Sequence, residues 1–263
     1  MGEVLVITSG KGGVGKTTTA ANLGTGFALT GKKVALIDAD IGLRNLDVVM
    51  GLENRIVYDL VDVVEGNCRL KQALIRDKRY ETLYLLPAAQ TRDKNAVNPE
   101  QMKKLCEELA RDFDYVIIDC PAGIEQGFRN AIAGATEAII VTTPEVSAVR
   151  DADRIIGLLE SEGKSNPKLI INRIRPHMVK KGDMMDIDDI IDILAIDLLG
   201  VIPEDEYIVI STNRGEPAVT HPSSLASTAY KNIVRRLCGE NVPLMSMEVR
   251  TSFLSKVKKF LKL

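Results

Sequence analysis

A glycine-rich loop near the amino terminus contains the residues best suited to chemistry. The stretch GKGGVGKTT at residues 10–18 contains the pattern G-x-x-x-x-G-K-[ST]. The backbone N–H groups of such a loop wrap a phosphate, its lysine faces the β- and γ-phosphates, and its hydroxyl is placed to bind Mg²⁺. We therefore expect a nucleotide site built from Gly10, Lys11, Gly12, Gly13, Val14, Gly15, Lys16, Thr17 and Thr18.

Two apolar runs that end in aspartate supply a second set of reactive groups. VALID ends at Asp38, with Asp40 two residues further on, and YVIID ends at Asp119. A parallel sheet carries such acids to the phosphate end, where they can bind Mg²⁺ directly or through water. We expect Thr17, Asp38 and Asp119 to serve the metal and Asp40 to orient the attacking water. If the strand continues past Asp38, the acids at 38 and 40 share a face; a turn or cap role is the alternative for each acid.

The elements that must position these residues alternate between strands and helices. Short Val/Ile/Leu runs, typical of strands buried on both faces, occur at 4–8, 33–38, 82–86, 115–119, 138–142, 168–172 and 199–202. Helix-like segments at 18–29, 99–111, 147–162, 187–194 and 223–237 separate or follow them. This alternation predicts the α/β class: a doubly wound, mostly parallel sheet with helices on both faces, as in P-loop NTPases. We expect one domain at 1–239, a linker at 240–248 and a separate helix at 249–263.

Composition narrows the class of protein. Of the 263 residues, 45% are hydrophobic and 27% are charged, and the net charge of −2 gives no reason to expect a nucleic-acid partner. The four cysteines form no C-x-x-C pair, which argues against a zinc site or a disulfide framework. The amino terminus resembles no signal peptide, and no run reaches 18 apolar residues. We expect a cytoplasmic protein.

The last residues have a different character. On a helix over VRTSFLSKVKKFLKL, at residues 249–263, apolar and basic side chains fall on opposite sides. The apolar side has Phe253, Leu254, Val257, Phe260 and Leu261, and the basic side has Lys256, Lys258, Lys259 and Lys262. A basic amphipathic helix of this kind is typical of one lying in an anionic membrane interface. Packing on the protein's own core is the alternative.

Lys11 adds a second cation to the phosphate loop. The motif KGGVGKT resembles that of the deviant Walker-A ATPases, the MinD/ParA family, and DCPAGIE at 119–125, PEVSAVRDADRI at 144–155 and GVIPED at 200–205 extend the likeness over nearly the whole chain. The resemblance implies an ATPase with ATP and Mg²⁺ as cofactors, in which Lys11 crosses a two-fold interface to the partner's nucleotide while Lys16 acts in cis. An ATP-bound homodimer is the expected active form.

The resemblance also implies further site residues and partners. Asn172 would read the adenine edge, or else cap its strand, and Pro203 and Asp205 would flank the base, while Arg44, Asn45 and Asp151 would lie near the site. The expected partners are a division inhibitor (MinC-like), a topological regulator (MinE-like or polar-anchored) and anionic lipid on the inner face of the cell membrane. A ParA-like DNA-partitioning ATPase is the alternative, and an iron–sulfur reductase is disfavoured because its ligand positions are not matched.

Overall fold

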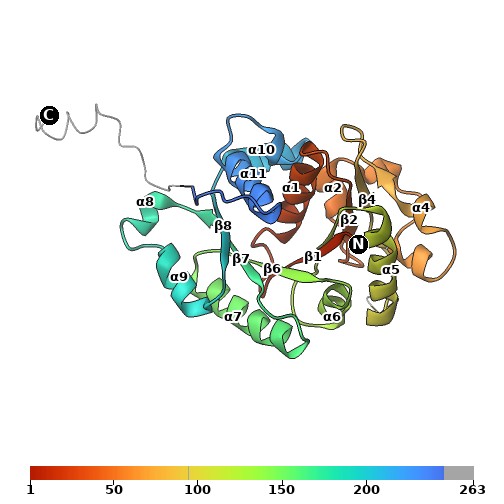
Figure 1. Ribbon diagram of the computed structural model, residues 1–263, viewed down its shortest axis with the longest axis horizontal. Coiled ribbons are helices and arrows are strands. Elements are labelled where there is room, and N and C mark those ends of the chain that lie inside the picture. Colours follow the sequence, from red (N-terminus) through yellow and green to blue (C-terminus); the bar gives the residue numbers. More distant parts are fainter. Residues whose placement is uncertain (94, 246–263) are drawn as a thin grey trace, which may run out of the picture.

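The computed structural model describes residues 1–93 and 95–245, which form an eight-stranded sheet between two layers of helices (Figure 1). The strand order is β3-β4-β2-β5-β1-β6-β7-β8. Each neighbouring pair is parallel except β3 and β4. The strands are β1 (Glu3–Thr8), β2 (Val34–Asp38), β3 (Ile75–Arg76), β4 (Leu83–Leu86), β5 (Tyr115–Asp119), β6 (Glu137–Thr142), β7 (Lys168–Ile174) and β8 (Leu198–Pro203). The expected fold class is confirmed.

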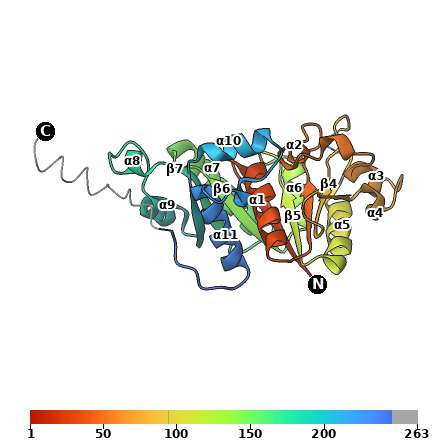
Figure 2. The same cartoon turned by 90° about the horizontal axis from the view of Figure 1, so that it is seen from above.

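The helices divide between the two faces of the sheet (Figures 1 and 2). One face is covered by α1 (Lys16–Leu29), α2 (Leu46–Met50), α10 (Glu206–Asn213) and α11 (Leu225–Leu237). The other is covered by α3 (Leu60–Val64), α4 (Leu70–Ala73), α5 (Pro99–Asp112), α6 (Gln126–Ala133), α7 (Val146–Ser161) and α9 (Ile187–Leu194). The short helix α8 (Pro176–Val179) and the 3₁₀ turns Glu53–Arg55 and Ala218–Thr220 complete the order.

Alternating strand residues feed two separate hydrophobic cores. In β1, Leu5 and Ile7 belong to the core beneath α1 and α11, whereas Val4 and Val6 belong to the core beneath α5 and α7. Side chains of a strand point alternately to opposite faces, so a strand buried on both faces needs an apolar residue at nearly every position. That requirement explains the unbroken Val/Ile/Leu runs in the sequence.

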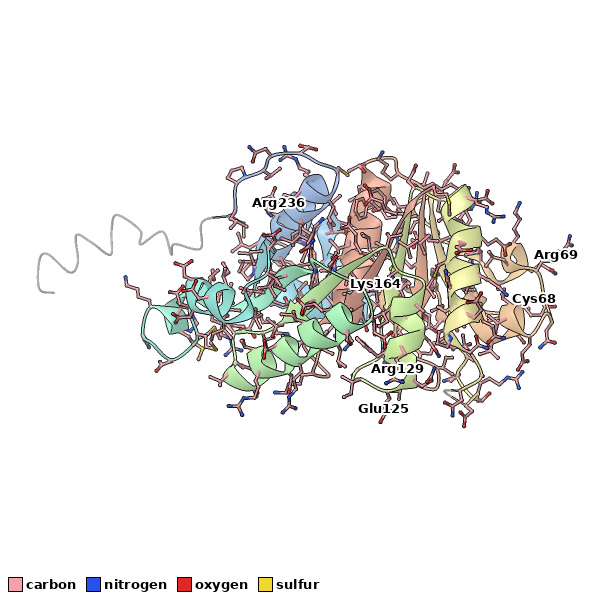
Figure 3. All side chains as sticks on the ribbon, turned by 60° about the horizontal axis from the view of Figure 1, so that its bottom comes forward. Cys68, Arg69, Glu125, Arg129, Lys164 and Arg236 are labelled. Carbon is pink, nitrogen blue, oxygen red and sulfur yellow. The ribbon has the colours of Figure 1, made fainter. Side chains whose placement is uncertain are left out.

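At each edge of the sheet, an arginine side chain donates a hydrogen bond to a backbone carbonyl. At the β3 edge, Arg55 Nη1 donates to the carbonyl of Arg76 at 2.9 Å. At the β8 edge, Arg236 Nη1 donates to the carbonyl of Leu199 at 2.9 Å. Arg236 extends from α11 beside the last described residues (Figure 3), and its remaining nitrogens bond the carbonyls of Val242 and Pro243. The segment that follows α11 is thereby held against β8.

The strand order reverses at β1, and this reversal locates the site. Strands β2 to β5 lie on one side of β1 and β6 to β8 lie on the other. In open α/β sheets, ligands bind outside the carboxyl ends of the strands at such a switch point. The loop at residues 9–15 leaves β1 there and leads into α1.

Candidate functional site

The phosphate loop has the backbone geometry that its glycines predict. Gly13 and Gly15 have φ values of 79° and 105°, a region that disfavours other residues. A Cβ on Gly15 would lie 2.3 Å from Nδ2 of Asn172, so this position also requires glycine for space. Lys11, Gly12 and Gly13 are exposed, which leaves the loop open to a ligand at the positive end of α1.

Lys16 is buried within the loop and is held there by a serine. Its Nζ donates to Ser9 Oγ at 3.0 Å, and that hydroxyl donates to the carbonyl of Lys11 at 2.8 Å. These two hydrogen bonds hold the buried ammonium group in place for a phosphate oxygen. Because the side chain is already ordered, it would lose little conformational entropy when a phosphate binds. Ser9 was not predicted as a site residue; its position directly before the motif was the available signal.

Asp38 and Asp119 lie side by side at the ends of adjacent strands. They are register partners in β2 and β5, and both are buried. Burial raises the pKa of Asp38 to about 6, against N–H donors of Asp40, Leu46 and Asn45 that lower it. Burial, followed by repulsion from Asp38, also raises the pKa of Asp119, against a hydrogen bond to Thr17 and the charge of Lys16. The pair is an unfavourable concentration of negative charge.

These groups fit a divalent cation. The Oδ1 atom of Asp119 is buried and makes no hydrogen bond with any described residue. It belongs to a carboxylate that already contacts the Thr17 hydroxyl, and oxygen ligands of this kind suit Mg²⁺. Within residues 1–93 and 95–245, no group of three or more His, Cys, Asp or Glu side chains could hold a metal by itself. A Mg²⁺ ion would therefore depend on phosphate oxygens for the rest of its coordination, as is usual in nucleotide sites.

Asp40 lies beyond the end of β2 rather than on its face. The strand ends at Asp38, and the backbone N–H of Asp40 turns back to donate to Asp38 Oδ1 at 3.0 Å. The chain therefore turns before a shared face can form, and the condition under which Asp38 and Asp40 would share a face is not met. Asp40 is half-buried, and its charge acts on both Asp38 and Asp119.

A cavity of about 150 Å³ lies beside the phosphate loop. Its walls include Gly15, Thr18, Asn172, Pro203 and Asp205. Asn172, Pro203 and Asp205, the three residues expected near the base, therefore lie together beside the phosphate loop. A pocket beside the phosphate loop would suit the base of a nucleotide.

Two polar side chains of this cavity also have structural partners. Asn172 is buried, and its Nδ2 donates to the carbonyl of Val14 at 2.8 Å. Asp205 accepts from the N–H of Tyr207 at the start of α10 and from Ser224 Oγ and the N–H of Ala226 at the start of α11. Asp205 thus caps two helices at once, and base recognition by either side chain stays a prediction.

Lys11 lies on the outside of the loop with partners from its own chain. Its Nζ is 3.1 Å from Ser147 Oγ and 3.8 Å from Glu145 Oε2, at the start of α7. The Lys11 side chain is 43% exposed, so it lies at the surface that surrounds the loop. The two cations of the loop therefore face different environments, with Lys16 inside and Lys11 outside.

The other residues expected near the site, Arg44, Asn45 and Asp151, belong to segments whose backbone contacts it. Asn45 N–H donates to Asp38 Oδ2 at 3.1 Å, and Arg44, at a φ of 37°, pairs with the buried Asp47 at 2.9 Å. A Cβ on Gly10 would lie 2.2 Å from the carbonyl oxygen of Asp151, so α7 packs directly on the loop. The loop after β2 and the helix α7 are therefore both in direct contact with residues of the phosphate site.

The expected membrane helix lies outside the described residues, as do its side chains Phe253, Leu254, Lys256, Val257, Lys258, Lys259, Phe260 and Leu261. The part of the linker at 240–245 has no helix or strand. Across the part of the chain that the structure covers, every helix is too short or too polar to span a bilayer.

The fold and the loop together define a P-loop nucleotide-binding protein. Residues 5–218 match the model of the CobQ/CobB/MinD/ParA nucleotide binding domain. The septum site-determining protein MinD of Bacillus subtilis strain 168 is 62% identical, over 99% of this chain and 98% of its own. MinD of Thermotoga maritima is 52% identical over 98% of this chain and 100% of its own. The chain belongs to the MinD family of septum site-determining proteins.

Solved structures agree with this assignment. The Aquifex aeolicus MinC:MinD cell division protein complex contains a chain 53% identical to this one, with a TM-score of 0.87 over 93% of this chain and 99% of that chain. MinD of Pyrococcus horikoshii, solved with Mg-ADP, is 31% identical, with a TM-score of 0.82 over 90% of this chain and 96% of its own.

Proposed function

We propose that the protein is a Mg²⁺-dependent ATPase that converts ATP to ADP and phosphate and uses this reaction as a switch. One observation carries the proposal: a buried Lys16, the Thr17 hydroxyl and the unbonded Oδ1 of Asp119 converge behind an exposed Lys11. Bound Mg²⁺ would neutralise charge on the phosphates and on the Asp38–Asp119 pair. Asp40 orients the attacking water.

The surface around the phosphate loop favours a face-to-face dimer. Large apolar side chains are exposed in the segments that follow β2, β5, β6 and β8, namely Leu43, Ile124, Val146 and Val209. Apolar groups gathered around a polar site are typical of protein interfaces. In such a dimer, Lys11 would leave Ser147 and Glu145 and reach the nucleotide of the second subunit. ATP would then hold the dimer together, and hydrolysis would release it.

Membrane attachment would follow from dimerisation. Burying the five side chains on the apolar side of residues 249–263 gives about 7–15 kcal/mol as an upper figure, and four lysines near an anionic leaflet add about 1 kcal/mol each. Ordering about a dozen residues costs roughly 12–24 kcal/mol, so one tail is marginal. Two tails on one dimer can gain about 10²–10⁴-fold by bivalency. On the membrane, the dimer recruits a MinC-like division inhibitor, and a MinE-like or polar-anchored regulator stimulates hydrolysis.

Vesicle sedimentation tests this proposal directly. The full chain should sediment with phosphatidylglycerol-containing vesicles in ATP but not in ADP, and Phe260→Glu or truncation after Met247 should abolish the binding in ATP. Equal binding in ATP and ADP would contradict the switch.

A ParA-like DNA-partitioning ATPase is the second candidate, because the family model spans both groups. A net charge of −2 gives it little support, since nonspecific DNA binding depends on phosphate contacts from basic residues. A DNA filter-binding assay with ATP, on the full chain and on the chain truncated after Met247, separates the two candidates. ATP-dependent retention of DNA by both proteins would favour partitioning.

A further inference from the structure

A large groove lies next to the nucleotide cavity on the side of α8 and α9. It has a volume of about 670 Å³ and runs between the start of α7, the end of β7 and the loop from α8 to α9. Arg173 and Glu204 line both this groove and the nucleotide cavity. The groove therefore shares a wall with the site but extends well beyond it.

The lining of the groove combines an apolar floor with an acidic rim. The floor includes the half-buried side chains Met178, Val179, Met184 and Met185. The rim includes five exposed acids, at 145, 183, 186, 189 and 204, and arginines at 173 and 175. Arg175 pairs with Glu204 and Glu145 lies near Lys11, so the acidic character comes mainly from the acids at 183, 186 and 189. Methionine side chains adapt to varied apolar shapes, and a methionine floor inside an acidic rim suits a basic amphipathic helix. We call this feature the acidic groove.

The chain itself contains a segment of matching chemistry. Residues 249–263 combine seven large apolar side chains with one arginine and four lysines and contain no acid. The charges of the acidic groove and of this segment are opposite, and each provides apolar groups that the other can cover. Charge complementarity of this kind selects the partner and its orientation.

The segment is long enough to reach the groove. The described chain is tethered up to Met245, which packs against the core beneath α11. Two residues earlier, the carbonyl of Pro243 is bound by Arg236 near Leu199 at the amino end of β8. Glu204, on the groove, follows the other end of this six-residue strand, roughly 20 Å away. The eight residues from Met245 to Phe253 span up to about 26–29 Å. In Figures 1 and 2 the last described residues run along the α8–α9 side of the molecule.

We propose that residues 249–263 dock in the acidic groove of their own chain when ATP is absent, and that this contact masks the membrane anchor. The inference rests on the proposed function, since it assumes that this segment is the anchor. Nucleotide binding next to the shared Arg173–Glu204 wall, together with dimerisation, releases the segment. The groove thus adds a second control on membrane binding to that given by bivalency. In the monomer, the single tail binds the membrane weakly and is also held in the groove.

Photocrosslinking of the full chain tests the contact without membranes. Val257 is replaced by p-benzoylphenylalanine, and the protein is irradiated in ADP and analysed by peptide mass spectrometry. Crosslinks should concentrate in residues 176–189 and should fall several-fold in ATP. Crosslinks spread over the surface, or equal in ADP and ATP, would overturn the proposal.

Vesicle binding tests the consequence. Asp183→Asn/Asp189→Asn removes two rim charges and should raise sedimentation of the ADP state with phosphatidylglycerol-containing vesicles by about threefold to tenfold. Asp188→Asn/Asp192→Asn removes two exposed charges of the same helix region outside the groove lining and serves as the matched control. Equal binding of the two double variants in ADP would contradict the masking proposal and leave the proposed function untouched. A wild-type chain that fails to bind vesicles in ATP would contradict the proposed function instead.

Discussion

Asp38 of β2 and Asp119 of β5 are register partners on adjacent parallel strands, so two buried carboxyl groups meet beside Lys16. Asp38 has three backbone N–H donors, whereas Oδ1 of Asp119 makes no hydrogen bond with any described residue. Burying a charged group without full compensation lowers stability. The nucleotide-free site is therefore strained electrostatically, and a cation would relieve that strain.

Replacing Asp119 by Asn should change the stability of the fold and the binding of nucleotide in opposite directions. We expect Asp119→Asn to raise the free energy of unfolding of the nucleotide-free protein by about 1–2 kcal/mol, because one buried charge is removed. The same change should weaken Mg²⁺-dependent nucleotide binding. Urea unfolding and nucleotide titration with and without Mg²⁺ measure the two effects. Asp112→Asn, at an exposed acid of α5, is the control, and a destabilised Asp119→Asn protein would refute this account.

Lys11→Ala should remove dimerisation and spare nucleotide binding. Lys11 is exposed and pairs only loosely with Glu145 at 3.8 Å, whereas Lys16 is buried within the loop. We therefore expect a folded monomer that binds ATP but shows no ATP-dependent dimer in analytical ultracentrifugation. Lys32→Ala, at an exposed lysine after α1, should dimerise as the wild type does. A dimer that persists in Lys11→Ala would rule out the trans role.

Asp40→Ala should leave ATP binding intact and lower turnover by about 10²-fold or more, the usual contribution of a positioned acid–base group. Single-turnover hydrolysis and equilibrium ATP binding distinguish the two quantities. An unchanged kcat would assign the water-orienting role to another residue.

Asp205 predicts a pH-dependent contribution to stability. Burial alone would raise the pKa of Asp205, but the N–H of Ala226, the Ser224 hydroxyl and the N–H of Tyr207 together lower it below 3.8. A depressed pKa in the folded state means stabilisation that is present above the unfolded value and is lost as pH falls through the folded value. Asp205→Ala should cost about 2–3 kcal/mol at pH 7.

Urea unfolding at several pH values measures this effect. The difference between wild type and Asp205→Ala should be constant from neutral pH down to about 4 and should shrink below 3.8. Asp205→Asn keeps one acceptor oxygen and should fall between the two proteins. A difference that grows on acidification would contradict the capping role.

The sequence predicted the parallel strands well because each is a run of Val, Ile and Leu buried on both faces. Expected and observed bounds differ by at most two residues, and α9 (Ile187–Leu194) begins and ends where it was expected. The antiparallel β3 was missed because two residues carry no periodic pattern. Helices α2, α3, α4, α6, α8 and α10 were not singled out, since most are too short to show a repeat. The equally short α9 was found because its apolar and acidic residues alternate at helical spacing.

The site was predictable where a motif fixes local geometry and unpredictable where distant residues meet. The phosphate loop and the acids ending β2 and β5 follow from local pattern. The contact of Lys11 with Ser147, 136 residues away, and the contact of Asp205 with Ser224, 19 residues away, depend on how the sheet brings loops together. Neither contact leaves a local pattern in the sequence from which it could be predicted.

The arginines at the two edges of the sheet bear on how copies of this chain can associate. An open sheet edge is a template for aggregation through strand pairing, and short strands and charged side chains protect against it. Here the β3 edge is two residues long and carries Arg55, while Arg236 and the chain it binds lie on the β8 edge. Crowded copies therefore have little route to fibril-like growth by strand pairing, and the proposed dimer would instead form reversibly through the loops at the carboxyl ends of the strands.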